Sequence, residues 1–384
     1  MSTTIAPGVY LDNAATTRLD PRISALVTTL FLEEYGNAGS RTHLYGANAQ
    51  SQLGRARERI AKALASEPDD VLFTSGATES DNLAILGVAP AAAAAGRRHI
   101  VSTMIEHKAV LEPLLRLESQ GFEVTRVRPD ARGHVAAAEV MSAVRPDTAL
   151  VSVMHANNET GALQPIGAIA DGLADDATLF HVDAAQTFGR LNAELRHPRI
   201  DLISLSAHKV FGPKGVGALI HRRRGGRRPA LTPLMVGGGQ ERGLRPGTHP
   251  VPLIAGFGLA AELAEAEAVD REAKCADLRR RALTALAPLE PVIHGDPERG
   301  VLPNILSFAV PGIDSEAVMV ALKGFVAISN GSACTSARYE PSHVLTAMEL
   351  PTAVRDGTIR LSWAHDTPEP DWAELVRRLD GLRL

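Results

Sequence analysis

The sequence predicts an α/β protein in which a large domain with a mostly parallel sheet is joined to a smaller α+β domain. Short apolar runs alternate with helical patterns from about residue 70 to residue 220, as in a parallel sheet covered on both faces. A Gly/Pro-rich segment at 235–250 and a long helical pattern at 252–286 then lead into a differently patterned C-terminal part. A chain of 384 residues is also too long for one compact core.

The alternating region divides into strands and helices in a regular order. The expected strands are 69–76, 99–105, 121–130, 148–157, 178–185, 201–209 and 215–223, and the expected helices are 77–89, 107–120 and 165–176. A Gly-Pro turn at 211–215 joins the last two strands. Since ligands of such sheets bind at the carboxyl ends of the strands, the residues that follow each strand are the candidates for chemistry.

The smaller domain is predicted from three segments, 301–310, 317–329 and 358–364. We place the large domain at residues 18–262 and the small domain at residues 1–17 and 263–384. The alanine run 91–95 is expected at a helix end or in a loop, and no internal repeat is found.

Composition excludes several classes of function. The net charge is −4, so global charge calls for neither a nucleic-acid nor a membrane partner, and no run approaches 18 uninterrupted apolar residues. The two cysteines, Cys275 and Cys334, form neither a disulfide framework nor a zinc site. Together with an N-terminal segment that lacks the pattern of a secretory signal, they predict a cytoplasmic protein without a metal.

One basic run could mark a partner site. The sequence HRRRGGRR at 221–228 places five arginines around two glycines. Charge runs are usually solvated, so we expect a hairpin tip in preference to a protein-partner or nucleic-acid site.

The first candidate for chemistry is the turn that follows the strand 69–76. Gly76 permits a tight turn, and Ala77 and Thr78 then open a helix whose free N–H groups favour an anion. The alternative is an ordinary helix with a capping residue, which is common at such starts.

Two further strand ends carry His107 and the pair Asn157 and Asn158. An imidazole at position 107 could lie over a bound ring, or His107 could be a hydrogen-bonded structural residue. The asparagines could reach a ligand, or could make hydrogen bonds within a turn.

Asp183 and Lys209 each follow an apolar strand. A buried carboxylate is costly unless it is paired, either with a cationic ring nitrogen or with an arginine. A lysine in a desolvated site near other cations becomes a usable amine, whereas an ordinary surface lysine is the alternative. A phosphate cradle, a histidine, an aspartate and a lysine at successive strand ends are what a pyridoxal phosphate site needs.

The C-terminal part adds a thiol and a guanidinium. Cys334 lies among small and polar residues, which predicts a partly exposed, reactive cysteine, while Cys275 lies in a helical pattern and is expected to be structural. Arg360 is a candidate clamp for a substrate carboxylate, with a strand-end surface arginine as the alternative.

Eight motifs now resemble a known family, the cysteine desulfurases of aminotransferase class V, of the iron–sulfur and nitrogen-fixation type. They are YLDNAATT (10–17), SGATESDN (75–82), EHKAV (106–110), HANNETG (155–161), HVDAAQ (181–186), SAHKVFGPKG (206–215), GGGQERGLRPGT (237–248) and GSACTSA (331–337). The resemblance covers residues 10–363 and implies a pyridoxal-phosphate-dependent transferase of fold type I.

The resemblance also implies a role for each matched residue. Lys209 would hold the cofactor aldehyde, Asp183 would pair with the ring nitrogen, Gln186 would bond the ring hydroxyl, and His107 would stack on the ring and shuttle protons. The phosphate would be held by Ala77, Thr78, Ser206 and His208, and by Thr248 of the other subunit of a homodimer. Asn37, Asn158 and Arg360 would bind the substrate, and Cys334 would be the nucleophile.

The implied reaction converts L-cysteine to L-alanine and passes sulfur, as a persulfide on Cys334, to an acceptor protein. Alternatives are a selenocysteine lyase or another enzyme of the class, and a sulfur-delivery subunit that has lost catalysis. The acceptor could serve iron–sulfur assembly, tRNA thiolation or DNA phosphorothioation.

The chain departs from the family pattern at three places. Pro246 stands where relatives usually have Ser, Val236 where they have His, and Ala364-His365 where a Gly-Arg pair often follows the Arg360 strand. These departures put the subunit-crossing loop and the acceptor in doubt, but leave the chemistry of Lys209 untouched.

Overall fold

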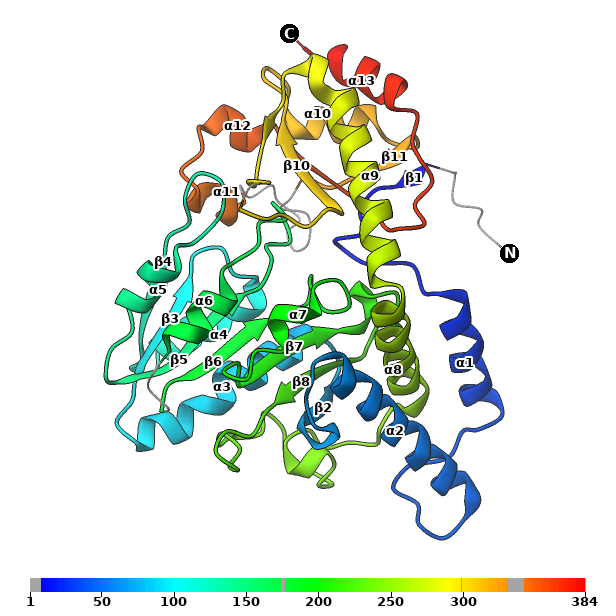
Figure 1. The fold of residues 1–384 in the computed structure, drawn as a ribbon, viewed down its shortest axis with the longest axis vertical. Helices are drawn as coiled ribbons and strands as arrows, with labels where there is room; N and C mark the ends of the chain where they lie inside the picture. Colours follow the sequence, from blue (N-terminus) through cyan, green and yellow to red (C-terminus); the bar gives the residue numbers. More distant parts are fainter. Residues whose placement is uncertain (1–7, 174–176, 298, 331–341, 384) are drawn as a thin grey trace.

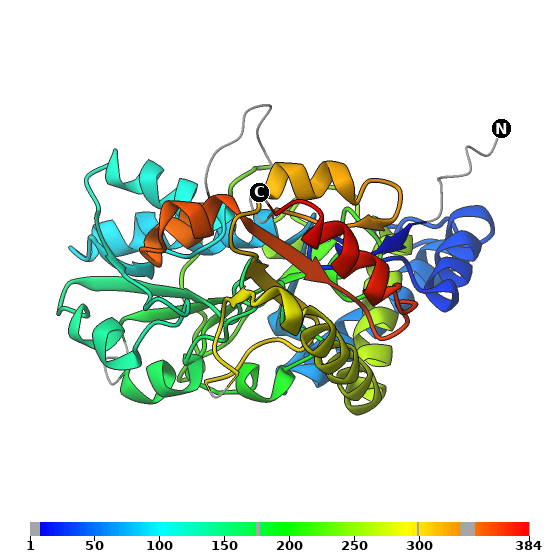
Figure 2. The ribbon, with the colours of Figure 1, turned by 90° about the horizontal axis from the view of Figure 1, so that it is seen from above.

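The computed structural model describes residues 8–173, 177–297, 299–330 and 342–383. A seven-stranded sheet forms the larger part of the molecule, and a smaller part with its own sheet lies above it in the view of Figure 1. Seen from above, the N-terminal helices and the segments of residues 100–150 lie toward opposite ends of the molecule (Figure 2).

The large sheet has the strand order β2-β8-β7-β6-β5-β3-β4. Its strands are β2 (Val71–Thr74), β3 (His99–Thr103), β4 (Glu123–Val127), β5 (Thr148–Met154), β6 (Leu179–Asp183), β7 (Leu202–Ser206) and β8 (Gly217–His221). Pairing from β4 to β7 is parallel, whereas β8 is antiparallel to both β7 and β2. The predicted α/β class with a mostly parallel sheet is confirmed, and each predicted strand has its counterpart.

Helices cover both faces of this sheet because its strands alternate two sets of apolar side chains. On one face Phe73 and Phe180 pack against α1 (Pro21–Leu32), α2 (Leu44–Ala63), α6 (Ile166–Gly172) and α8 (Val251–Ala266). On the other face Leu72 and Ile100 pack against α3 (Ala77–Ala94) and α4 (Lys108–Glu118). The helices α1 and α2 were not anticipated from the sequence, nor were the short helices α5 (Ala137–Ser142) and α7 (Asn192–Leu195).

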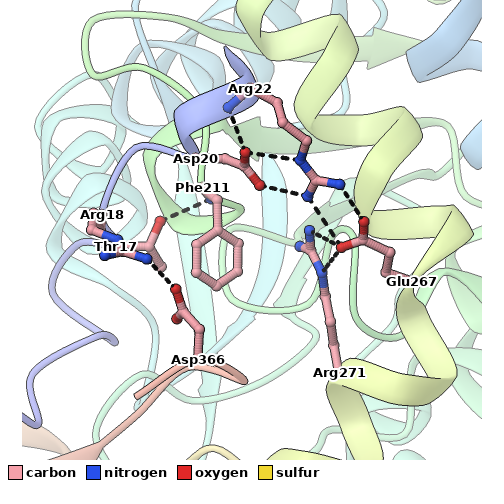
Figure 3. A network of polar contacts seen from close by, with 8 residues as sticks. All are labelled: Thr17, Arg18, Asp20, Arg22, Phe211, Glu267, Arg271 and Asp366. Carbon is pink, nitrogen blue, oxygen red and sulfur yellow. Dashed lines mark hydrogen bonds and ion pairs between the residues drawn. The ribbon is translucent and has the colours of Figure 1, made fainter. Parts of the chain in front are cut away.

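The long helical pattern at 252–286 is interrupted, so it forms two helices instead of one. Helix α8 ends at Ala266 and α9 (Ala268–Leu286) begins after Glu267, whose carboxylate accepts hydrogen bonds from Arg22 at 2.6 Å and Arg271 at 2.7 Å (Figure 3). The same junction holds Asp20, which caps α1 and pairs with Arg22. We name these acidic and basic residues at the α8–α9 break the junction network.

The smaller part has a three-stranded antiparallel sheet of order β12-β10-β9 and a parallel strand pair, β1 with β11. Its elements are β1 (Val9–Tyr10), β9 (Val292–Ile293), β10 (Ile305–Ala309), β11 (Val326–Ala327), β12 (Thr358–Ser362), α10 (Ser315–Ala321), α11 (His343–Ala347), α12 (Thr352–Asp356) and α13 (Trp372–Asp380). A separate apolar cluster that includes Leu11, Phe308 and Trp363 forms its core. The N-terminal strand therefore packs with C-terminal segments, although the boundaries 17/18 and 262/263 stay a prediction.

The arginine-rich run differs from the expected solvated tip most at Arg222, and Arg228 is half-buried and pairs with Asp70 at 2.9 Å. Arg222 is buried, and its guanidinium donates to the carbonyl oxygens of Leu64, Leu195 and His197. The expectation is wrong for this residue because free carbonyl groups at a helix end and a turn accept its hydrogen bonds. The turn itself lies at Arg224–Arg227, where Arg224 lies 3.5 Å from Asp201.

In the ranges that the structure describes, no helix combines the length and apolarity needed to cross a membrane.

Candidate active site

A cavity of about 490 Å³ lies at the carboxyl ends of the parallel strands. Most of the predicted site residues line it, namely Ala77, Thr78, His107, Asn158, Asp183, Gln186, Ser206, His208, Lys209 and Arg360. The edge of the sheet therefore brings together residues from strand ends that are distant in sequence, as expected for this fold.

Three predicted residues are not part of this lining. Asn37 is exposed and its side-chain oxygen accepts a hydrogen bond from Gly39 N at 2.8 Å. Thr248 is exposed in the segment between the 3-10 turn η3 (Glu241–Gly243) and α8. Cys334 lies outside the described residues. Substrate binding by Asn37, phosphate binding by Thr248 in a second subunit and the nucleophilic role of Cys334 stay predictions.

The start of α3 is suited to an anion. Gly76 precedes the helix and no side chain caps its first N–H groups, unlike the ordinary capped helix considered as the alternative. The turn also packs closely on β8, since a Cβ atom added at Gly217 would lie 2.6 Å from Gly76 Cα. Ser206 and His208 line the same cavity. An uncapped 18-residue helix with hydroxyl and imidazole groups nearby fits a phosphate.

Lys209 ends the 3-10 turn η2 (Ala207–Lys209), which directly follows β7. Its Nζ atom donates to the carbonyl oxygen of Ala15 at 2.9 Å and also to that of Ala14. His208 Nδ1 lies 3.1 Å from the hydroxyl of Thr16. The N-terminal segment 14–16 thus holds the lysine inside the cavity, which excludes the ordinary surface lysine.

Asp183 ends β6 and is buried. Its Oδ1 accepts a hydrogen bond from Ala185 N at 2.8 Å, and burial raises its pKa to about 6. Among the described residues no lysine or arginine forms an ion pair with it, so the arginine salt bridge considered as the alternative is absent there. A buried carboxyl of this kind fits the cationic nitrogen of a bound ring.

His107 and Gln186 are held by backbone groups. His107 caps α4, where Nδ1 accepts a hydrogen bond from Ala109 N at 3.1 Å, and burial lowers the pKa of its ring. A neutral imidazole bonded in this way carries its proton on Nε2. Gln186 Nε2 donates to the carbonyl oxygen of Ala14 at 3.0 Å.

Arg360 comes from β12 of the smaller part and is buried, so a surface arginine is excluded. Its Nη2 pairs with Asp12 at 2.7 Å and its Nη1 donates to the carbonyl oxygen of Asn158 at 2.8 Å. Its Nε has no hydrogen-bond partner among the described residues. A guanidinium with unused donors in a cavity is suited to a carboxylate ligand.

The structure also distinguishes the roles of residues for which the sequence left alternatives open. Asn157 accepts hydrogen bonds from Glu159 N and Thr160 N, both at 2.9 Å, so it makes turn contacts, whereas Asn158 lines the cavity. Cys275 is buried and burial raises its pKa to about 11, in agreement with a structural role.

Sequence reasoning gave no role to several residues that line the cavity, among them Asp81, Lys214 and the segment 14–16. Lys214 and the segment 14–16 belong to two motifs already noted, SAHKVFGPKG and YLDNAATT. The sequence therefore contained the signal, but it gave no spatial contact from which a role could be assigned. Asp81 belongs to SGATESDN, where it reads as an ordinary helical position.

An anion-binding helix start opposite a strand-end lysine and a buried aspartate defines a pyridoxal-phosphate-dependent transferase of fold type I. The chain belongs to the family Aminotransferase class-V, which its residues 9–375 match. The resemblance found in the motifs is thereby confirmed.

The chain is similar to proteins that carry more specific names. It is 44% identical over 382 residues to "Cysteine desulfurase IscS" of Vibrio cholerae, covering 98% of this chain and 93% of that protein. A solved "NifS-like protein" matches with a TM-score of 0.89 and 37% identity, covering 98% and 99% of the two chains. DndA from Streptomyces lividans matches with a TM-score of 0.81 and 48% identity, covering 92% and 99%.

The cofactor of the protein is pyridoxal 5′-phosphate, and the described residues fit it. The uncapped start of α3 would take the phosphate, Asp183 would face the ring nitrogen, and Lys209 would bond the aldehyde. When bound, this cofactor supplies a ring that accepts electrons from the substrate.

Proposed function

We propose that the protein is a cysteine desulfurase, which converts L-cysteine to L-alanine and passes the sulfur through Cys334 to an acceptor protein. The observation that carries the proposal is the meeting of Lys209, Asp183 and Arg360 in one cavity, although Arg360 comes from a separate sheet. The similarity to proteins named cysteine desulfurase supports the same reaction.

The residues of the cavity divide the work of binding. Arg360 binds the substrate carboxylate with donors that Asp12 and Asn158 leave unused, and so directs the amino group toward Lys209. Asp183, as a carboxylate, holds a proton on the ring nitrogen. His107, whose Nδ1 is engaged with α4, has Nε2 available to move a proton near the substrate.

Cys334 completes the reaction as a thiolate. Its sulfur attacks the substrate sulfur, a sulfur–sulfur bond forms, and the bond between the substrate sulfur and its Cβ breaks. The electron pair of that bond stays with the three-carbon product, which becomes alanine after protonation. The acceptor then takes the terminal sulfur. Whether the acceptor serves iron–sulfur assembly, tRNA thiolation or DNA phosphorothioation stays a prediction.

We further propose a homodimer. Large apolar side chains are exposed around the connection between α1 and α2 and before η3, namely Phe31, Leu32, Tyr35, Leu44, Tyr45, Met235 and Val236. Exposed apolar surface of this kind supports burial by a second copy. Thr248 is exposed after η3, and Met235 and Val236 are exposed before it, which is compatible with Thr248 reaching a second subunit. A cytoplasmic location is also proposed, since the two widely separated cysteines of the sequence fit a reducing compartment.

Two variants test the proposed reaction. Cys334→Ala is expected to abolish sulfide and alanine release while the visible cofactor band remains, because the thiol does not hold the ring. Lys209→Ala is expected to lose the band that depends on its amine. A desulfurase requires the first result together with wild-type release of alanine from cysteine. Amino transfer dependent on a keto acid would favour an aminotransferase, release only from selenocysteine would favour a lyase for that substrate, and a colourless wild type would indicate a non-catalytic subunit.

A further inference from the structure

The face of the large sheet that is covered by α3 becomes polar toward the carboxyl ends of its strands. His181 on β6 is fully buried there, with Nδ1 2.8 Å from the hydroxyl of Ser152 and Nε2 2.9 Å from the hydroxyl of Ser204. The serines belong to the neighbouring strands β5 and β7. This layer lies directly behind the cofactor cavity, since Asp183 follows His181 by two residues on the same face of β6.

Asp81 projects from the second turn of α3 onto this layer and lines the cavity with Asp183. Only 1% of Asp81 is exposed, and neither of its carboxyl oxygens makes a hydrogen bond of good geometry in the described part of the chain, although the nearby Ser204 hydroxyl favours its charged form. Its nearest charged or titratable contact is His181, whose Nε2 lies 3.5 Å from Asp81 Oδ1. A buried carboxyl without hydrogen bonds is costly and calls for an explanation.

His181 does not neutralise this carboxyl. Burial lowers the pKa of His181 to about 4, so the imidazole is uncharged near neutral pH. Burial raises the pKa of Asp81 to about 7, and the charge of Asp81 adds to burial in raising the pKa of Asp183. Glu106, three residues after the end of β3, is a third buried acid, and burial together with the charges of Asp183 and Asp81 raises its pKa to about 8. Asp81 from α3 and Asp183 from β6 thus line one cavity, which Lys209 and Lys214 also line, and the uncharged His181 lies beside Asp81.

We propose that Asp81 is a positioning residue that acts through Asp183, adding the negative potential that keeps the ring nitrogen of the cofactor protonated and the cofactor bound. When ionised, the carboxylates of Asp81 and Asp183 repel each other in the cofactor-free protein. A cation beside Asp183 attracts both charges and offsets that repulsion. The unpartnered oxygens of Asp81 are explained if its charge is directed to a cation that the cofactor brings. The inference rests on the proposed function, because it assumes that the cavity binds pyridoxal 5′-phosphate.

The test is Asp81→Asn, which preserves the shape of the side chain and removes the charge. At pH 8 the dissociation constant for pyridoxal 5′-phosphate should rise about tenfold, the effect expected from one charge several ångströms from a partly shielded cation. The thermal midpoint of the cofactor-free variant should rise by about 3 °C, since the repulsion with Asp183 is gone. Both differences should shrink at pH 5, where wild-type Asp81 is protonated.

Asp201→Asn is the matched control, because Asp201 is a buried acid that pairs with Arg199 at 2.8 Å. It should leave cofactor affinity unchanged, because Asp201 does not line the cavity. An Asp81→Asn protein with wild-type affinity at pH 8, or with a lowered midpoint, would overturn the inference alone. Wild-type protein that binds no pyridoxal 5′-phosphate would overturn the proposed function and this inference with it.

Discussion

Two regions of the molecule hold buried or half-buried acids, and they treat them in opposite ways. In the junction network, Asp20 and Glu267 accept hydrogen bonds from Arg22, which lower the pKa of both, that of Glu267 to about 2 (Figure 3). In the cofactor cavity, burial raises the pKa of Asp183 to about 6 and that of Asp81 to about 7.

The acids of the junction network contribute to the stability of the fold, whereas the acids of the cavity contribute to ligand binding. A carboxylate beside a guanidinium favours the folded state, whereas a buried carboxyl without a cation disfavours it until a ligand supplies one. The ion pairs of the junction network connect α1 to the α8–α9 break. The acids of the cavity are positioned to interact with the cationic ring of a bound cofactor. Changes in the two regions should therefore have opposite effects on the cofactor-free protein.

The largest expected effect follows from replacing Asp183. Asp183→Asn should lower the rate of alanine formation by about 100-fold or more, because an amide does not hold the ring nitrogen protonated. The same change should leave the cofactor-free protein at least as stable as wild type, because it removes a buried acid without a cation partner. Alanine release and urea unfolding of the cofactor-free protein measure the two effects. Activity within tenfold of wild type would remove Asp183 from its role.

Unlike Asp81 and Asp183, the charged side chain of Arg360 in the cavity has an ion-pair partner, Asp12. Arg360→Ala should raise the KM for L-cysteine by about 10- to 100-fold, the loss expected for charged hydrogen bonds to a carboxylate. Cofactor affinity should change by less than about threefold, because Arg360 is proposed to contact only the substrate. Steady-state kinetics and cofactor titration provide the two measurements, and Arg360→Lys tests whether charge alone restores binding. An unchanged KM would exclude the clamp.

The pH dependence of the cofactor-free protein should reveal the cavity acids. Asp81 and Asp183 have folded-state pKa values of about 7 and about 6, above the ordinary value of 3.8. Their contribution to stability is complete below pH 3.8 and is lost as the pH rises through 6 and 7. Glu267 behaves in the opposite way, since its contribution is present above pH 4.5 and is lost as the pH falls toward 2.

The thermal midpoint of the cofactor-free protein should consequently fall by about 5 °C between pH 5 and pH 8. The cofactor-bound protein should show a smaller fall, because the ring cation offsets the ionised acids. Scanning calorimetry of both forms measures this difference. Parallel curves for the two forms would contradict the comparison drawn between the regions.

The smallest effect is expected in the junction network. Glu267→Gln should lower the free energy of unfolding by about 1 kcal/mol, since Glu267 is partly exposed and bonds to two arginines. Asp366→Asn, which removes a single exposed pair with Arg18, is the control and should cost less than about 0.5 kcal/mol. Urea unfolding measures both, and the KM for cysteine should stay at its wild-type value. A change in KM would show that the junction reaches the cavity.

Local sequence patterns were sufficient for most of the fold. Most strands of the large sheet are apolar runs bounded by turn residues, and β4 (EVTRV) was recognised from its place in the alternation of strands and helices, so all seven could be predicted. Helices α1 and α2 escaped prediction because they precede the alternating region, and the pattern at 252–286 did not show the break at Glu267, where the side chain bonds to Arg22. A bond to Arg22, 245 residues away in the chain, leaves no mark in the local pattern.

For the site, the sequence by itself determined which chemical groups stand at strand ends, namely Lys209, Asp183, His107 and the turn at Gly76. A strand end is a local feature, and parallel strands bring their carboxyl ends to one edge whatever their order. Tertiary structure alone decided that Arg360 enters this cavity from another sheet and that Ala14 and Ala15 hold the lysine. It also decided that Asp81 is buried without a cation beside it, because burial and the distance between charges depend on how remote segments pack.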